Sequence, residues 1–127
     1  TNYLIKKLAD KYNLKILEDA CEAIGASYED KKVGGIGDCG VFGFYPNKQI
    51  TMGEGGVLVT NNDDIASLCR SLKNQGRDEG AGWLAHSRLG YNYRISEIQC
   101  AIGVAQLQRI DEILQIVCNF STESQTD

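Results

Sequence analysis

The chain has 127 residues, of which 43% are hydrophobic and 24% are charged, with 14 glycines and a single proline. This composition is typical of a globular protein that is long enough to form one domain with its own hydrophobic core. The net charge is −4, and no apolar run reaches the length of a membrane span. Neither nucleic acid nor a membrane is therefore expected as a partner.

The chain has five cysteines: Cys21, Cys39, Cys69, Cys100 and Cys118. They are odd in number and have no metal-ligand spacing, and three of them fall in apolar segments. Buried cysteine behaves as a small hydrophobic residue. We expect reduced thiols in a cytoplasmic protein and no metal site.

The first forty residues begin with a helix and a strand. Apolar residues recur at helical spacing in the opening segment, at Leu4, Ile5, Leu8, Ala9 and Tyr12. This spacing predicts a short amphipathic helix. A strand is expected over residues 14–17. Residues 20–39 are marked by glycines and are expected to be irregular.

The next twenty residues indicate two strands joined by a reversal. We expect a strand over residues 40–45, ending at Pro46 because proline has no N–H for ladder pairing. Glycines at residues 53–56 reverse the chain into a β-branched strand over residues 57–60.

The last part of the chain indicates two helices separated by a polar loop. Asn62 and Asp63 are suited to cap a helix that runs to Lys73 and ends before Gly76. After a loop over residues 76–94, Ser96 and Gln99 fit a capping box. The long helix that follows would carry one apolar stripe: Ile98, Ile102, Ala105, Ile110, Ile113 and Val117. Helices and strands in alternation predict an α/β fold with a mostly parallel sheet.

Asp19 and Lys48 stand out because each follows the end of a predicted strand. Ligands of parallel sheets bind at the carboxyl ends of the strands. Lys48 also follows an aromatic segment, and an amine held among apolar groups loses its charge more readily, as a nucleophilic lysine requires. The alternative is that Lys48 is an ordinary surface lysine, which its own spacing favours.

Two other features could indicate a function, a glycine-rich pattern and the single histidine, but the surrounding sequence argues against both. Residues 35–40 match G-x-G-x-x-G, the dinucleotide-binding fingerprint, but they precede a strand, whereas the fingerprint needs a strand before it and a helix after it. His86, the one histidine, has no carboxylate close in sequence, so a hydrogen-bonding or interface role is favoured over acid–base catalysis.

Three separated motifs resemble those of one family. They are Glu18-Asp19-Ala20-Cys21-Glu22-Ala23-Ile24-Gly25-Ala26, then Phe44-Tyr45-Pro46-Asn47-Lys48 with Gly53-Glu54-Gly55-Gly56, then Gly90-Tyr91-Asn92-Tyr93-Arg94. Their types and order resemble the DegT/DnrJ/EryC1/StrS sugar aminotransferases. The resemblance implies the type I, aspartate-aminotransferase-like fold and pyridoxal 5′-phosphate as cofactor. It implies that residues 1–115 are the central part of a cofactor-binding large domain, incomplete at both ends. Residues 116–127 form a tail that does not resemble the family.

The resemblance also implies roles for individual residues. Lys48 matches the lysine that forms an imine with the cofactor and then moves a proton in catalysis. Asp19 matches the carboxylate that keeps the pyridine nitrogen protonated. Glu22 stands near the ring, where the family usually has glutamine or histidine, so its contact is left open.

Two further cofactor-binding positions follow from the same resemblance. Gly43 occupies the position of a serine that often holds the cofactor phosphate, and glycine offers only its backbone N–H there. Asn92 matches a residue that the family places against the phosphate from the neighbouring subunit. A homodimer with a shared active site is therefore expected.

The implied function is transfer of an amino group, from glutamate, onto a keto-sugar that is linked to a nucleotide, in the synthesis of a polysaccharide, a lipopolysaccharide or an antibiotic sugar. The alternatives are an aminotransferase for a keto-cyclitol, or a truncated fragment without catalytic activity. Family members that became dehydratases have histidine in place of this lysine, and Lys48 argues against that branch.

Overall fold

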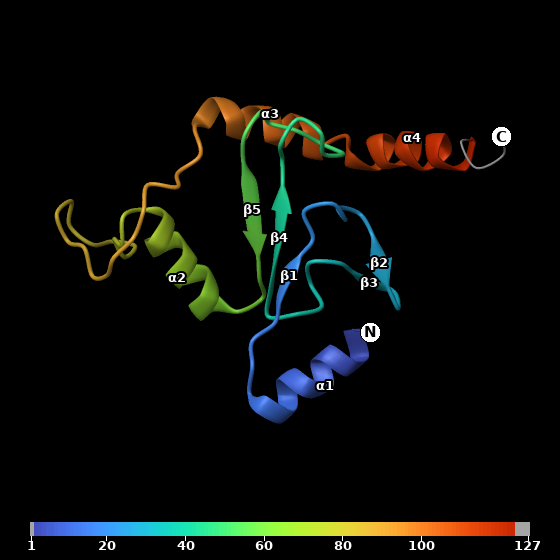
Figure 1. The fold of residues 1–127 in the computed structure, drawn as a ribbon. Helices are drawn as coiled ribbons and strands as arrows, with labels where there is room; N and C mark the ends of the chain where they lie inside the picture. Colours follow the sequence, from blue (N-terminus) through green and yellow to red (C-terminus); the bar gives the residue numbers. More distant parts are fainter. Residues whose placement is uncertain (1, 124–127) are drawn as a thin grey trace.

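The computed structural model describes residues 2–123, which form four helices and five strands (Figure 1). In chain order these are α1 (Asn2–Tyr12), β1 (Leu17–Asp19), β2 (Ser27–Tyr28), β3 (Lys31–Lys32), β4 (Cys39–Gly43), β5 (Gly56–Val59), α2 (Asp63–Lys73), α3 (Glu97–Leu107) and α4 (Ile110–Glu123).

The main sheet has the order β1-β4-β5. β1 and β4 are parallel, with Leu17 opposite Cys39, and β4 and β5 are antiparallel, with Val41 opposite Leu58. The predicted α/β fold is confirmed, and this part of its sheet is mixed, with one parallel and one antiparallel pair. Because β1 and β4 run in the same direction, residues that follow them meet at one edge of the sheet (Figure 1).

β1 begins three residues later than predicted. The Ile16 N–H donates to the Asp38 carboxylate at 2.8 Å, and the Asp38 N–H donates to the Ile16 carbonyl at 2.9 Å. Lys15 and Ile16 thus bond to the segment before β4, Leu14 bonds to the Ala9 carbonyl of α1, and ladder pairing starts only at Leu17. The later start of β1 is therefore caused by a contact between residues 22 positions apart, which the local sequence pattern could not predict.

The segment 20–39, predicted to be irregular, contains the small antiparallel hairpin of β2 and β3. Its two turn residues, Glu29 and Asp30, have φ of 47° and 62°. Positive φ at both central positions is the geometry of the tight hairpin turn that matches strand twist. The prediction missed the hairpin because Glu-Asp is not among the usual sequences for that turn.

Both predicted helix caps are confirmed. The Asn62 side chain accepts the Ile65 N–H at the start of α2, and Ser96 and Gln99 form a reciprocal capping box at the start of α3. α2 ends at Lys73, and Gly76, with φ of 76°, donates its N–H to the Ser71 carbonyl.

The long C-terminal helix is divided into α3 and α4. At the break, the Arg109 N–H donates to the Gln106 carbonyl, three residues back, which tightens the turn. The single apolar stripe was therefore wrong in part: Ile110 and Ile113 pack on the core, whereas Ile98 is 76% exposed. The buried residue of α3 is Gly103.

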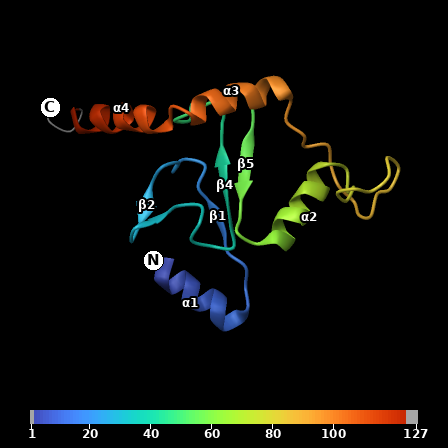
Figure 2. The ribbon, with the colours of Figure 1, turned by 180° about the vertical axis from the view of Figure 1, so that it is seen from behind.

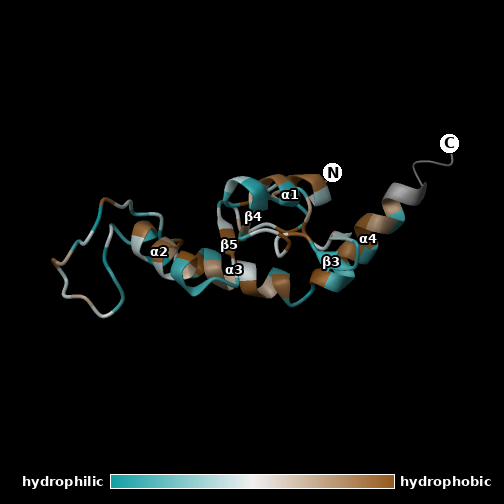
Figure 3. Ribbon diagram, turned by 90° about the horizontal axis from the view of Figure 1, so that it is seen from below, coloured by the Kyte–Doolittle hydropathy of each residue, from teal (hydrophilic) through white to brown (hydrophobic). Residues whose placement is uncertain are grey.

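The core lies where β4 ends beneath α3 and α4. Phe44, Ile50 and Met52 are buried there, and partly buried residues pack around them: Ile24, Phe42, Ile95, Ile110 and Ile113. Seen from behind, α3 crosses the upper ends of β4 and β5, and α4 continues beyond the two strands (Figure 2). Seen from below, α1 lies on one side of the strands and α3 on the other, and each helix carries hydrophobic segments (Figure 3).

Candidate active site

Lys48 lies in a closed loop that follows β4. The Phe44 carbonyl accepts the Met52 N–H at 3.1 Å and so closes the loop. Within it, the Lys48 N–H donates to the Tyr45 carbonyl at 3.0 Å. Because Phe44, Ile50 and Met52 are buried, the two ends of this loop are anchored in the core, and the lysine is held by a rigid support.

Asp19 is the last residue of β1, and its carboxylate turns back onto its own chain. Its Oδ1 accepts the Cys21 N–H at 3.2 Å, a local turn that aspartate side chains favour. Hydrogen bonds from the Cys21 side chain and backbone, with a smaller contribution from the Lys48 ammonium, lower the pKa of Asp19. The hydrogen bond between the Asp19 carboxylate and the Cys21 thiol raises the pKa of that thiol. Asp19 is thus a stable anion beside a thiol that stays protonated.

Lys48 forms an ion pair with Glu22, which links the turn after β1 to the loop after β4. The Lys48 side chain is 15% exposed and that of Glu22 is 72% exposed. The next residue, Gln49, donates its side-chain N–H to the Glu22 carbonyl at 3.0 Å. Glu22 is therefore held by two consecutive residues of the Lys48 loop.

Gly43, the last residue of β4, lies between Lys48 and the turn that follows Asp19. A Cβ built on Gly43 would be 3.7 Å from Lys48 Cε and 3.7 Å from Cys21 Sγ. These are ordinary van der Waals distances, so a side chain at this position would fit between the lysine and the turn that follows Asp19. The structure thus brings together four of the five predicted site residues: Asp19, Glu22, Gly43 and Lys48.

Asn92, the fifth, lies elsewhere. It forms an isolated bridge with Asn74, just after α2, and its side chain accepts the Arg94 N–H at 3.4 Å. The loop over residues 76–94 extends from the side of β5 that is remote from β1 (Figures 1 and 2). The contacts of Asn92 are thus with Asn74 and Arg94, and not with the Lys48 loop.

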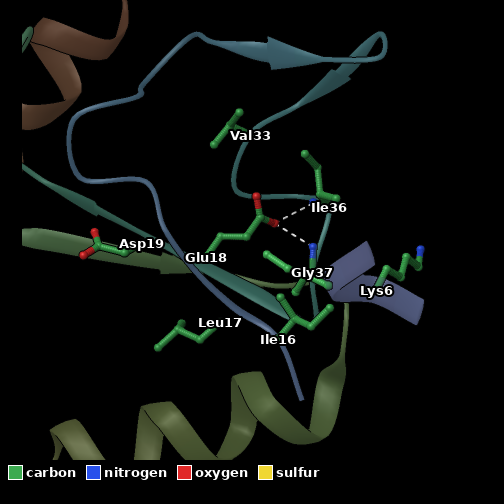
Figure 4. Close-up of a pocket in the computed structure, with 9 residues that line it drawn as sticks. Lys6, Ile16, Leu17, Glu18, Asp19, Val33, Ile36 and Gly37 are labelled. Atoms are coloured by element: carbon green, nitrogen blue, oxygen red, sulfur yellow. Dashed lines mark hydrogen bonds between the residues drawn. The ribbon is translucent and has the colours of Figure 1, made fainter. Parts of the chain in front are cut away.

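The glycine-rich segment 34–37 binds a carboxylate of the protein itself. Glu18 Oε1 accepts the N–H groups of Ile36 and Gly37, both at 2.6 Å, and Oε2 accepts that of Gly34 at 2.9 Å (Figure 4). Burial acts to raise the pKa of Glu18, but these three bonds outweigh it and lower the pKa. Three backbone N–H groups of this segment thus bind the Glu18 carboxylate and not a ligand. This agrees with the prediction that the G-x-G-x-x-G pattern is not a dinucleotide-binding site.

A cleft of about 300 Å³ lies between α1 and β1 and is lined by Ile5, Lys6, Leu17 and Asp19, among others. Figure 4 shows the Asp19 side chain directed away from Glu18, as expected for neighbours on a strand. Lys48 does not line this cleft. Asp19 and Lys48 therefore lie at and after the carboxyl ends of β1 and β4, and Lys48 lies outside the cleft.

His86 bonds to the Gln75 carbonyl through Nδ1 at 2.8 Å, in agreement with the hydrogen-bonding role predicted for it. Cys21, Cys39, Cys69 and Cys100 are free thiols. Over residues 2–123, no group of three or more acidic, histidine or cysteine side chains is arranged to hold a metal ion. None of the described helices is long and apolar enough to cross a membrane.

Sequence reasoning missed two residues at the site, Cys21 and Gln49. Cys21 follows Asp19 by two positions, where an aspartate turn recruits a backbone N–H, and this spacing was an available signal. Gln49 reaches Glu22 across 27 positions, for which no local signal exists. An amine, a stable carboxylate and a carboxylate that pairs with the amine are the groups needed to bind an aldehyde covalently and to move protons beside it.

Comparison with known proteins agrees with this arrangement. The chain is 49% identical over 110 residues to a GDP-perosamine synthase of Caulobacter vibrioides, covering 87% of this chain and 29% of the relative. It is 41% identical to a UDP-4-amino-4,6-dideoxy-N-acetyl-beta-L-altrosamine transaminase of Campylobacter jejuni, covering 87% and 30%. A solved DegT DnrJ EryC1 StrS aminotransferase from Brucella abortus superposes with a TM-score of 0.81 at 30% identity, covering 88% and 30%.

The chain therefore spans about 30% of the length of the relatives that it matches. The model of one family matches residues 3–116, nearly the whole chain. That match includes the ends of β1 and β4 with Asp19 and Lys48. The chain belongs to the DegT/DnrJ/EryC1/StrS aminotransferase family.

Proposed function

We propose that this chain is the central part of an aminotransferase that uses pyridoxal 5′-phosphate and transfers an amino group to a keto-sugar. The observation that carries the proposal is that Asp19 and Lys48 lie at and after the carboxyl ends of two adjacent parallel strands, close enough for the Lys48 charge to contribute to the lowered pKa of Asp19. Family membership supports the reaction class. We also propose that residues 1–115 are the central part of the cofactor-binding domain and that residues 116–127 are outside it.

The residues at the site fit this cofactor. Lys48 supplies an amine, and Asp19 supplies an anion whose lowered pKa keeps it charged. Gln49 Oε1 is buried without a hydrogen-bond partner beside Lys48 and is an acceptor that a polar ligand could use. Gly43 has no side chain and so leaves space for the cofactor phosphate next to Lys48. The only hydrogen-bond donor that Gly43 offers is its backbone N–H.

When bound, pyridoxal phosphate supplies an aldehyde for covalent attachment and a protonated ring that accepts electrons from the substrate carbon. Asp19 would hold the proton on the ring nitrogen, because an anion at that position favours the charged ring. Lys48 Nζ would hold the cofactor and would move a proton at the substrate carbon. Glu22 is the nearest partner for the amine while it is free.

The proposed substrate is a keto-sugar linked to a nucleotide, with glutamate as the amino donor. The names of the matched synthase and transaminase, which refer to GDP- and UDP-sugars, support this class. We further propose a homodimer in which Asn92 reaches the cofactor phosphate of the partner subunit, which the position of Asn92 away from its own Lys48 supports. The free thiols of Cys21, Cys39, Cys69 and Cys100 support a reducing location, the cytoplasm.

The test of the cofactor site is chemical mapping. Purified protein is mixed with pyridoxal phosphate, reduced with borohydride and digested, and the labelled peptides are identified by mass spectrometry. The proposal predicts one dominant label on Lys48 and its loss in Lys48→Ala. Exposed Lys15, which pairs with Asp38, serves as an internal reference for non-specific labelling. Equal labelling of Lys15 and Lys48 would refute the site.

The substrate class is tested separately, in a longer chain that includes the remaining length of the relatives. Nucleotide-linked keto-sugars and a keto-cyclitol are offered with glutamate, and the aminated products are identified by mass spectrometry. We expect amination of a nucleotide-linked sugar. Amination of the cyclitol alone would replace the substrate and leave the cofactor site intact.

A further inference from the structure

Glu22 holds the reactive amine of Lys48 in an ion pair, and this pair is a feature of the present chain that the resemblance did not specify. Lys48 is largely buried, while the Glu22 side chain is 72% exposed. The pair is therefore formed at the mouth of the site, between a lysine on a rigid loop and a carboxylate that reaches it from the turn after β1.

A second bond fixes the carboxylate at this position. The side-chain N–H of Gln49 donates to the Glu22 carbonyl at 3.0 Å, so the backbone of Glu22 is tied to the residue that follows Lys48. Gln49 itself lies on the loop whose ends are anchored by Phe44 and Met52. Glu22 is thus positioned for Lys48 by the fold, and its contact with the amine does not depend on a freely moving side chain alone.

We infer that Glu22 is a positioning residue that retains the Lys48 amine and must release it before the amine captures the cofactor aldehyde. In that capture, the Lys48 ammonium first loses one proton to solvent; the neutral amine then forms a C=N bond with the aldehyde carbon, and its two remaining protons leave with the aldehyde oxygen as water. No oxidant or reductant is needed. The ammonium form cannot attack the aldehyde, so breaking of the ion pair precedes bond formation. The inference rests on the proposed function, since it assumes capture at Lys48.

Because the Glu22 side of the ion pair is open to solvent, breaking the pair has a small free-energy cost. The expected change in the rate of cofactor capture is therefore small. Glu22→Gln keeps the shape of the side chain and removes its charge. We expect this variant to capture pyridoxal phosphate on Lys48 about two- to fivefold faster than the wild-type chain at neutral pH and low salt. Salt screens exposed pairs, so the wild-type rate rises between low and high salt, and the rate of the variant does not.

Glu79→Gln is a matched control. Glu79, in the loop after α2, is also 72% exposed and pairs with a cation, Arg70 of α2, away from Lys48. The two variants have the same net charge, so the general repulsion between the negatively charged chain and the anionic cofactor changes equally in both. Pyridoxal, which has no phosphate, is a second probe, since it removes most of that repulsion and leaves the effect of the local ion pair.

The measurement is the rate of borohydride-fixed labelling of the Lys48 peptide, with circular dichroism to confirm that each variant is folded. Acceleration in Glu22→Gln alone, with both probes, supports the inference. Equal rates in the wild type, Glu22→Gln and Glu79→Gln would overturn it and leave the proposed function intact. The salt dependence of the wild type tests it without any variant, and a flat rate with pyridoxal would overturn it. Absence of label on Lys48 in every protein would overturn the proposed function and the inference together.

Discussion

Gly43 illustrates how a single residue shapes the site. It ends β4 next to Lys48, and a Cβ at this position would have contacts of 3.7 Å to Lys48 and Cys21. Glycine is therefore not required by space. Its consequence is chemical, because the position that resembles a phosphate-binding serine has no hydroxyl.

We predict that Gly43→Ser binds pyridoxal phosphate about tenfold tighter than the wild type. A hydrogen bond to a charged group contributes about 1.5–3 kcal/mol, and 1.4 kcal/mol corresponds to a factor of ten. The measurement is the dissociation constant from absorption titration. Gly43→Ala adds the Cβ without the hydroxyl and should not show the gain. Equal tightening in both variants, or tightening toward pyridoxal, would show that the hydroxyl does not reach the phosphate.

At the scale of the elements, two loops are held by contacts that the sequence pattern does not display. The segment 34–37 wraps around the half-buried carboxylate of Glu18 on β1. The loop 76–94 is closed at its base by Gly76, whose positive φ and close approach to Arg88 exclude a larger residue. Each contact supports a different side of the sheet.

Glu18→Gln should lower the free energy of unfolding by about 1–3 kcal/mol at pH 7, because three backbone donors lose a charged acceptor. The pKa of Glu18 is lowered from its ordinary value of 4.5. Its contribution is therefore fully present above pH 4.5 and is lost as the pH falls through the folded-state pKa. Urea unfolding at several pH values should show the gap between wild type and variant closing toward pH 3. Glu54→Gln, an exposed control, should show no such gap; a gap that stays constant with pH would refute the role of the charge.

Gly76→Ala should destabilise the protein by more than about 1 kcal/mol and open the loop 76–94. Gly76 has φ of 76°, and an added Cβ would lie 1.8 Å from the Arg88 carbonyl oxygen. Limited proteolysis, together with chemical unfolding, measures both effects. Gly82 lies in the same loop with no atom within 4 Å of an added Cβ, so Gly82→Ala is the control. Equal sensitivity of the two variants would contradict the account of Gly76.

Much of the fold was predictable because its signals are local. The caps at Asn62 and Ser96 and the strand end that precedes Lys48 are encoded within a few residues. The grouping of Asp19 with Lys48 was predictable because parallel strands end at one edge. The features that were not predicted depend on tertiary contacts. Asp38 binds the Ile16 N–H, so that β1 starts later than expected, and Glu18 binds a loop 16–19 residues away. Helical periodicity identified an apolar stripe but not which face the core would cover, so Ile98 was misplaced.

At the scale of the whole molecule, the core is small. Among the described residues, the buried hydrophobic side chains are Ala9, Ala20, Phe44, Ile50 and Met52, whereas many large apolar residues are exposed. Most of the stability gained from apolar burial is therefore concentrated beneath α3 and α4, next to the Lys48 loop. The same few side chains maintain the fold and hold the reactive lysine.

Ile50→Ala should lower the free energy of unfolding by about 2–5 kcal/mol, because it removes a buried side chain from a core that has few others. Ile50 is 2% exposed, and Ile98 is 76% exposed. Ile98→Ala should change the free energy by no more than about 0.5 kcal/mol. Denaturant unfolding compares the two, and similar losses would contradict the location of the core.

The central claim is that Asp19 and Lys48 serve one bound cofactor, and the role of Asp19 at the ring nitrogen is its most specific part. The dissociation constants of the wild type and Asp19→Asn are measured for pyridoxal phosphate and for the analogue in which carbon replaces the ring nitrogen. A charge-assisted bond contributes about 1.5–3 kcal/mol. The account predicts that Asp19→Asn weakens binding of pyridoxal phosphate by about 10- to 100-fold and leaves binding of the analogue unchanged. Equal weakening toward both compounds, or no weakening toward either, would contradict it.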